Sequence, residues 1–205
     1  MHIELLVEEP SAEAALTEIL PRFVAGDVSW TIHVHQGKGD LLSKLPNRLK
    51  GYARWLPVDW YILVLLDNDG GDCHRLKRDL EEAAAEAGLS TMSSKKSSGR
   101  FQVINRIAME ELEAWFFGDE EALRRAYPGV PRSLHRKAAY RDPDAIKGGT
   151  CEALERVLRR RGYFKEGLRK IEAARTIARE MDPARNRSRS FCCFRDAIVG
   201  LTSIR

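Results

Sequence analysis

The stretch YILVLLDNDGGDC, residues 61–73, joins a run of apolar residues directly to a cluster of aspartates. Tyr61 to Leu66 are all apolar or aromatic, which is typical of a strand covered by helices on both faces of its sheet. Asp67, Asp69 and Asp72 follow at once, separated only by Asn68 and glycines. Like charges repel, so a buried strand with such a tip predicts that a cation or a proton neutralises these charges at the sheet edge.

Strand and helix patterns alternate on both sides of this stretch. Strands are predicted at residues 3–7, 29–35, 61–66 and 101–108. Helices are predicted at residues 10–24, 41–56 and 72–88, and again over 109–128 with a break near Gly118. Residues 93–100 form a polar loop. The alternation predicts an α/β fold with a mostly parallel sheet flanked by helices.

The chain changes character beyond Pro131. Residues 131–150 are rich in turn residues, and residues 151–162, 167–181 and 190–204 read as helices. Residues 121–205 hold 21 Lys+Arg against 10 Asp+Glu, a balance of +11, whereas residues 1–120 hold 13 against 20, or −7. We therefore expect an acidic α/β domain over residues 1–130, with a basic helical extension over 131–205 packed on it.

Composition narrows the protein class. With 205 residues, 43% apolar and 31% charged, the chain has the make-up of an ordinary globular protein. It has no run near the ~18 apolar residues of a membrane span, and MHIELLVEEP lacks the basic start of a signal peptide, so a cytoplasmic protein without a membrane partner is expected. The four cysteines have no CxxC spacing, which favours reduced thiols.

The aspartate pair predicts a divalent cation. In open α/β sheets, ligands bind beyond the carboxyl ends of the strands, where Asp67 and Asp69 stand. Carboxylate oxygens suit Mg²⁺ or Mn²⁺, which also meet substrate phosphates. The alternative is structural: DNDGGD has the composition of a turn, and Asp72 is a normal N-cap for the helix that follows.

Two further acidic clusters strengthen the metal hypothesis. Glu8 and Glu9 follow the first strand, so Glu8 faces the aspartate pair if strands 3–7 and 61–66 are neighbours. A third cluster consists of Glu110, Glu111 and Glu113. Residues two apart on a helix point about 200° apart. Glu111 and Glu113 are therefore not both ligands unless the helix begins between them; exposed glutamates on an amphipathic helix are the alternative.

A glutamate after the first strand and Asp67-Asn68-Asp69 after a later one resemble the TOPRIM fold of topoisomerases, primases and OLD-type nucleases. The stretches LLVEEPSAEAAL, QGKGDLLSKLPNRLKGYARW, LLDNDGGDC, AMEELEAWFFGD and NRSRSFCCF resemble an uncharacterised bacterial TOPRIM-like family over nearly the whole chain. This resemblance implies that Glu8 acts as general acid/base or metal ligand, with Asp67 and Asp69 as a metal pair. It makes Glu113, with Glu111 beside it, a further acidic position. The usual glycine after the glutamate is Glu9 here.

These roles predict a Mg²⁺- or Mn²⁺-dependent nuclease or related phosphoryl-transfer protein, and the resemblance suggests a place in defence or mobile-element systems. Nucleic acid is the expected partner, held by basic residues: Lys38 on a glycine loop, Arg159, Arg160, Arg161, Arg185, Arg187 and Ser188. Solvated helix faces are the alternative for the arginine runs.

Two other functions stay open. The chain can be a non-catalytic metal- and nucleic-acid-binding partner that recruits a separate ATPase or effector. Alternatively, LDNDGG begins a haloacid-dehalogenase-like phosphatase with Asp67 as nucleophile. That family has Thr or Val two residues after the second aspartate, where this chain has Gly71, and no convincing downstream lysine and acids follow.

Overall fold

The computed structural model describes residues 1–94 and 99–202, and it confirms the predicted α/β class. The sheet has four strands, all parallel, in the order β2-β1-β3-β4. They are β1 (His2–Val7), β2 (Ser29–Val34), β3 (Trp60–Asp67) and β4 (Val103–Ala108). Residues 95–98 of the predicted polar loop, and the last residues of the helix predicted to end at 204, lie outside the described residues.

The strand order places β1 and β3 side by side in the middle of the sheet. Their register runs from His2 opposite Trp60 to Val7 opposite Leu65. Because every strand is parallel, all four carboxyl ends reach the same edge. The neighbour relation on which the Glu8 prediction depends is thus confirmed.

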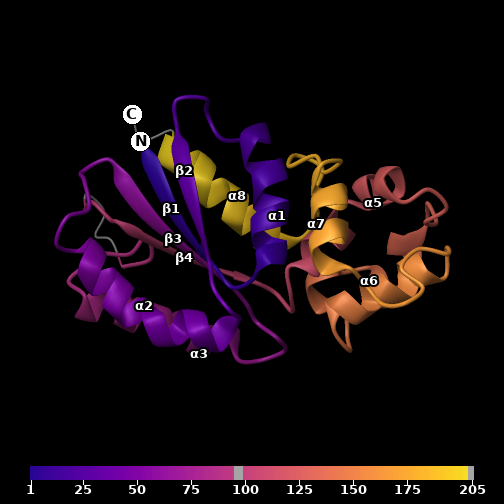
Figure 1. Ribbon diagram of the computed structural model, residues 1–205, viewed down its shortest axis with the longest axis horizontal. Coiled ribbons are helices and arrows are strands. Elements are labelled where there is room, and N and C mark those ends of the chain that lie inside the picture. Colours follow the sequence, from indigo (N-terminus) through magenta and orange to yellow (C-terminus); the bar gives the residue numbers. More distant parts are fainter. Residues whose placement is uncertain (95–98, 203–205) are drawn as a thin grey trace.

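Helices cover both faces of the sheet (Figure 1). The helices α2 (Lys38–Tyr52) and α3 (Cys73–Glu86) lie on one face, and α1 (Pro10–Ile19) and α8 (Arg189–Thr202) lie on the other. Ile62, Val64 and Leu66 of β3 pack in the α2/α3 cluster, whereas Leu63 and Leu65 pack in the opposite one. Two apolar layers explain why the sequence of β3 is apolar without alternation.

The remaining helices form a second group beside the sheet (Figure 1). They are α4 (Glu113–Gly118), α5 (Glu120–Ala126), α6 (Thr150–Arg159) and α7 (Lys170–Ala178), with short 3₁₀ turns at 134–136, 138–140 and 143–145. The predicted helix over 109–128 is broken after Gly118, as expected, but it begins at Glu113. No helix in the described ranges is long and apolar enough to cross a membrane, and all four cysteines are free.

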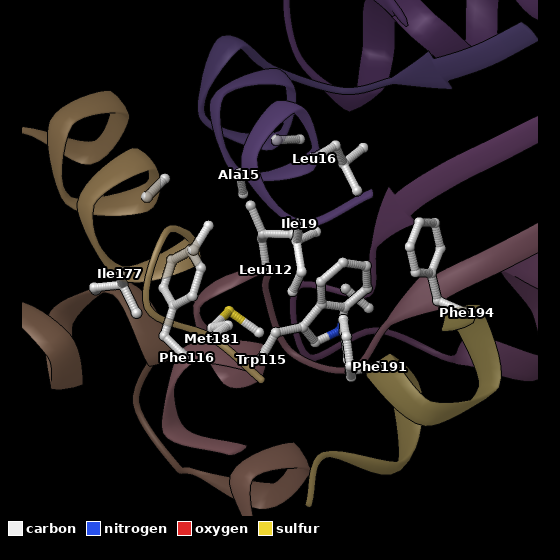
Figure 2. Packing of buried hydrophobic residues seen from close by; sticks show 14 of the residues in the cluster. Ala15, Leu16, Ile19, Leu112, Trp115, Phe116, Ile177, Met181, Phe191 and Phe194 are labelled. Atoms are coloured by element: carbon white, nitrogen blue, oxygen red, sulfur yellow. The ribbon is translucent and has the colours of Figure 1, made fainter. Parts of the chain in front are cut away.

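One apolar cluster joins this helical group to the sheet. Trp115 of α4 meets Phe191 and Phe194 of α8, with ring centroids 5.2 and 4.9 Å apart. Figure 2 shows Trp115 below Ile19 of α1, with Ile177 of α7 farther away beside Phe116, and all of these residues belong to the same cluster. The division at residue 130 stays a prediction, and the apolar core is continuous across it.

The end of α4 is locked to the segment that precedes α8. Asn186 donates from Nδ2 to the Trp115 carbonyl (2.8 Å), and the Arg187 amide donates to the Gly118 carbonyl (3.0 Å). A Cβ placed on Gly118 would lie 2.0 Å from Asn186 Oδ1. Only a glycine at position 118 therefore permits this approach.

We expect Gly118→Ala to lower the free energy of unfolding by roughly 1–3 kcal/mol, because the added methyl group must displace the buried Asn186 side chain. Gly51→Ala is the matched control: Gly51 lies in α2 with open space around it, so alanine there is neutral or stabilising. Urea unfolding of both variants measures the difference, and equal stability of the two would contradict this packing.

Candidate functional site

The carboxyl edge of the sheet gathers charged residues from all four strands. Glu8 and Glu9 follow β1, Lys38 begins α2 after β2, Asp67 ends β3, and Glu113 begins α4 after β4. We call Glu8, Asp67, Asp69 and Glu113 the acidic centre. The topology makes this edge the place where a ligand is expected.

Glu8 and Asp67 are in direct contact. The backbone amide of Asp67 donates to Glu8 Oε2 at 3.3 Å. Glu8 is half-buried, and Asp67 is only 9% exposed. The structure therefore places the Glu8 carboxylate against the backbone of Asp67, near enough for the charge of Glu8 to raise the pKa of the Asp67 carboxyl group.

The loop after β3 serves the fold as well as the site. Asp72 caps α3 by accepting from the amides of His74 (2.9 Å) and Arg75 (3.1 Å), so the turn-and-cap interpretation is confirmed for this residue. Asp69 and Gly70 have φ of +52° and +68°, in the left-handed region that Asp and Gly tolerate in turns. Asp69 is exposed at the tip of this turn.

Lys38 holds the same loop in place. Its Nζ donates to the Asp67 carbonyl (2.7 Å), the Asn68 carbonyl (3.2 Å) and Asp69 Oδ2 (3.0 Å). Lys38 was expected to reach a phosphate. In the structure its ammonium group lies beside the acidic centre and is already bound to the aspartate loop.

Glu113 is the most buried member of the acidic centre. Its side chain is 1% exposed, and its Oε2 has no hydrogen-bond partner among the described residues. A buried carboxylate oxygen without a partner is costly, since burial removes the water that would otherwise bind it. Such an atom marks a place where a proton or cation is needed.

Glu111 has a different role. Its Oε2 accepts from Thr150 Oγ1 (3.0 Å) and from the Cys151 amide (2.7 Å), so it caps the start of α6. The helix α4 begins between Glu111 and Glu113, which is the condition under which both can face one site. Glu110, with φ of +61°, turns the chain between β4 and α4.

Burial and mutual repulsion shift the titration of the acidic centre. Burial, followed by the charges of Glu113 and Glu8, raises the pKa of Asp67 well above its usual range. Burial raises the pKa of Glu113 to about 7, although Lys170 opposes the shift. Burial also raises the pKa of Glu8, despite the hydrogen bond from the Asp67 amide. Without a cation, these groups hold protons at pH values where ordinary carboxyl groups are ionised.

Lys170 is a site residue that the sequence did not reveal. Its Nζ lies 3.7 Å from Glu9 Oε1. Burial alone would lower the pKa of Lys170, but the nearby charges of Glu113 and Glu9 outweigh burial and raise it. Lys170 begins α7 in the basic half of the chain, and only the packing of α7 against α1 brings it to the acidic edge. No local motif distinguishes it from the other lysines.

Cys151 also lies near Glu113. Burial, then the charge of Glu113, raises the pKa of its thiol to about 12. A thiol that keeps its proton at neutral pH is a poor nucleophile. We therefore assign Cys151 no part in the chemistry.

The predicted phosphate-binding residues fall in two other places. Three of them are exposed at the far end of α6: Arg159, Arg160 and Arg161. A helix of ten residues is about 15 Å long, so they lie about that far from the end that Glu111 caps. Arg185 and Arg187 flank Asn186 near Gly118, and Ser188 is fully buried with its hydroxyl donating to Asp144 Oδ1 (2.8 Å). Within the described part of the chain, none of them forms an ion pair with the acidic centre.

An open pocket of about 330 Å³ lies beside the acidic centre. It is lined by Asp69, Gly70, Glu110, Glu111, Gly148, Gly149 and Glu152. Its four carboxylates and its glycine backbone favour a cationic or metal-bound ligand. Across residues 1–94 and 99–202, no three or more His, Cys, Asp or Glu side chains are already grouped closely enough to hold a metal ion.

Comparison with protein families matches residues 7–201 to DUF4276, a domain of unknown function. The chain belongs to the DUF4276 family. The expectation of an uncharacterised family is thereby confirmed. No curated protein and no solved structure matches the DUF4276 chain.

Glu113 makes stability depend on pH in the metal-free protein. Between its ordinary pKa of 4.5 and about 7, the unfolded chain releases a proton that the native state keeps, so this group makes the free energy of unfolding fall as pH rises. We expect Glu113→Gln to remove that fall. Relative to the wild type, its free energy of unfolding should be higher at pH 8 than at pH 4 by roughly 2–3 kcal/mol.

Urea unfolding in EDTA at the two pH values measures this gain. Glu82→Gln, at an exposed position on α3, is the matched control for loss of one glutamate. If Glu113→Gln changes the free energy of unfolding equally at both pH values, the fold does not suppress the ionisation of Glu113.

Proposed function

We propose that this DUF4276 chain is a Mg²⁺- or Mn²⁺-dependent enzyme that hydrolyses phosphodiester bonds of nucleic acid. The observation that carries the proposal is the burial of Asp67 and Glu113 at one sheet edge, next to Glu8, with Glu113 Oε2 unpartnered. Repelling carboxylates in a low-dielectric place are best neutralised by a divalent cation.

The donor set fits a hard cation. The proposed ligands are Asp67, Asp69 and Glu113, which offer only carboxylate oxygens, as Mg²⁺ and Mn²⁺ prefer. When bound, such an ion supplies a water of lowered pKa and neutralises charge on the phosphate. Because the carboxylates are not already grouped as a ready site, binding must draw their side chains closer together.

Residues of the chain itself supply the remaining roles. Glu8 is the proposed general base, since it is half-buried with a raised pKa, and a base works best when its pKa approaches the working pH. Lys170 and Lys38 flank the acidic centre with positive charge, which favours an approaching phosphate. Exposed arginines of the helical half, including Arg159, Arg160 and Arg161, are proposed to hold the polyanion farther out.

The resemblance to TOPRIM domains supports the same conclusion. In the sequence, Glu8, Asp67 and Asp69 match the acidic residues of that pattern, and they lie at the ends of two neighbouring parallel strands. We extend the proposal to a cytoplasmic location and to service in defence or mobile-element systems.

A second candidate is a non-catalytic binding partner that recruits a separate ATPase or effector. The ion pair between Lys38 and Asp69 favours this candidate, because it engages one carboxylate of the proposed metal pair. A haloacid-dehalogenase-like phosphatase ranks below both, since its nucleophile would be the largely buried Asp67.

Nuclease assays decide between these candidates. We expect purified protein to cleave plasmid, single-stranded DNA or RNA with Mg²⁺ or Mn²⁺, and expect Asp67→Asn to lower the rate at least about 100-fold by removing a metal ligand. Asp59→Asn is the matched control, because Asp59 precedes the opposite end of β3 and is exposed.

Each outcome has a distinct meaning. Loss of cleavage in Asp67→Asn but not in Asp59→Asn supports the enzyme. Salt-sensitive binding of nucleic acid without cleavage supports the binding partner. Release of phosphate from small phosphoesters, with polynucleotides left intact, would favour the phosphatase.

Metal binding should compete with protons. The raised pKa values of Asp67, Glu8 and Glu113 mean that Mg²⁺ must displace protons below about pH 7. We expect Mg²⁺ at about 10 mM, a concentration above the Kd of a weak site, to raise Tm more at pH 8 than at pH 6. Glu113→Gln should reduce this difference, and an equal Tm shift at both pH values would argue against a proton-linked site.

A further inference from the structure

A second polar pocket lies at the opposite end of α4 from Glu113. Its volume is about 380 Å³, within the range of small-ligand sites. It is lined by Gly118, Asp119, Glu120, Glu121, Arg124, Arg132, His135, Arg185 and Arg187. Because α4 spans only Glu113–Gly118, the two ends lie about 8 Å apart along the helix axis.

We call this cavity the arginine pocket. Its acidic residues are already bound to other groups of the protein. Asp119 is fully buried and accepts from Arg185 Nε (2.7 Å) and Nη2 (2.8 Å) in a bidentate pair. It also accepts from the Asp182 amide at 2.8 Å. Asp119 therefore acts as a support that orients Arg185, and it is not open to an incoming cation.

The two glutamates are engaged in the same way. Glu120 accepts from the Leu134 amide (2.9 Å) and from the His135 ring. Glu121 pairs with Arg124 (2.5 Å) and Arg125 (3.2 Å). Their negative charges are thus already paired with neighbouring hydrogen-bond donors.

Two arginines of the pocket have charges that no described acidic residue pairs with. Arg132 and Arg187 are exposed, and neither forms an ion pair with any residue that the structure describes. Arg187 is nevertheless held firmly at its backbone, because its amide donates to the Gly118 carbonyl and the adjacent Asn186 is locked to Trp115. The pocket therefore offers guanidinium groups on a rigid base.

We propose that the arginine pocket binds a phosphate group. Planar guanidinium groups match phosphate oxygens through paired hydrogen bonds, and Arg132 and Arg187 supply them. A second step of the inference rests on the proposed function: the phosphate belongs to the polynucleotide whose neighbouring linkage lies at the acidic centre. The affinity for phosphate itself does not depend on that function.

Calorimetric titration of the full chain tests the proposal with three probes. They are inorganic phosphate, a nucleoside monophosphate and the matching nucleoside, all at constant ionic strength. We expect the first two to bind and the nucleoside not to bind. Arg187→Ser and Arg132→Ser should each weaken binding about ten-fold, the usual effect of one charged hydrogen bond.

Matched variants separate this site from the acidic centre. Arg54→Ser removes an exposed arginine outside the pocket and should leave phosphate binding unchanged. Asp67→Asn should also leave it unchanged, even if it abolishes cleavage, so failure of the proposed function and failure of this pocket give different results. No phosphate binding, or binding unaffected by Arg187→Ser and Arg132→Ser in folded protein, overturns the proposal.

A competition experiment tests the second step. An oligonucleotide without terminal phosphates should displace the nucleoside monophosphate if the pocket accepts a backbone phosphate. Absence of displacement would overturn the polynucleotide assignment and leave a pocket for free or terminal phosphate.

Discussion

Electrostatic repulsion at the carboxyl edge of the sheet is the constraint to which the other features of the site respond. Four parallel strands end together, so the chain cannot place acidic residues after β1 and β3 without bringing Glu8 and Asp67 into contact. Helices on both faces then exclude water from this edge, and Glu113 is added from α4. Burying repelling carboxylates costs free energy, a cost that is common where a protein retains polar groups for function.

The helix α4 connects the two polar regions of the molecule. Its first residue, Glu113, belongs to the acidic centre, and its last, Gly118, supports the arginine pocket. Between them, Trp115 packs against α8 in the apolar cluster. A short helix fixed at both ends and in the middle keeps the two regions at a constant separation. A substrate that reaches both would therefore be held in one register.

The sequence allowed the elements, and the meeting of Glu8 with Asp67, to be predicted because both depend on short-range patterns. Apolar runs defined β1 and β3, and the parallel arrangement then placed Glu8 beside Asp67. Lys170 and the pairing of Arg185 with Asp119 depend on contacts between segments far apart in the chain. Ser188 shows the same limit: its hydroxyl resembles a phosphate ligand in the sequence, yet in the fold it is buried against Asp144. Charge and composition alone do not tell a surface hydroxyl from a buried one.

Protons and a divalent cation are the two ways to relieve the repulsion, and the proton is the poorer one at neutral pH. The pKa of Glu113 is about 7, so neutral pH lies near the point at which this proton is lost. Lys170 offsets part of the remaining charge, because it lies near Glu113 and within 3.7 Å of Glu9. One divalent cation would neutralise two carboxylates at once and would also give Glu113 Oε2 a partner. We infer that the acidic centre suits a cation better than it suits its own protons.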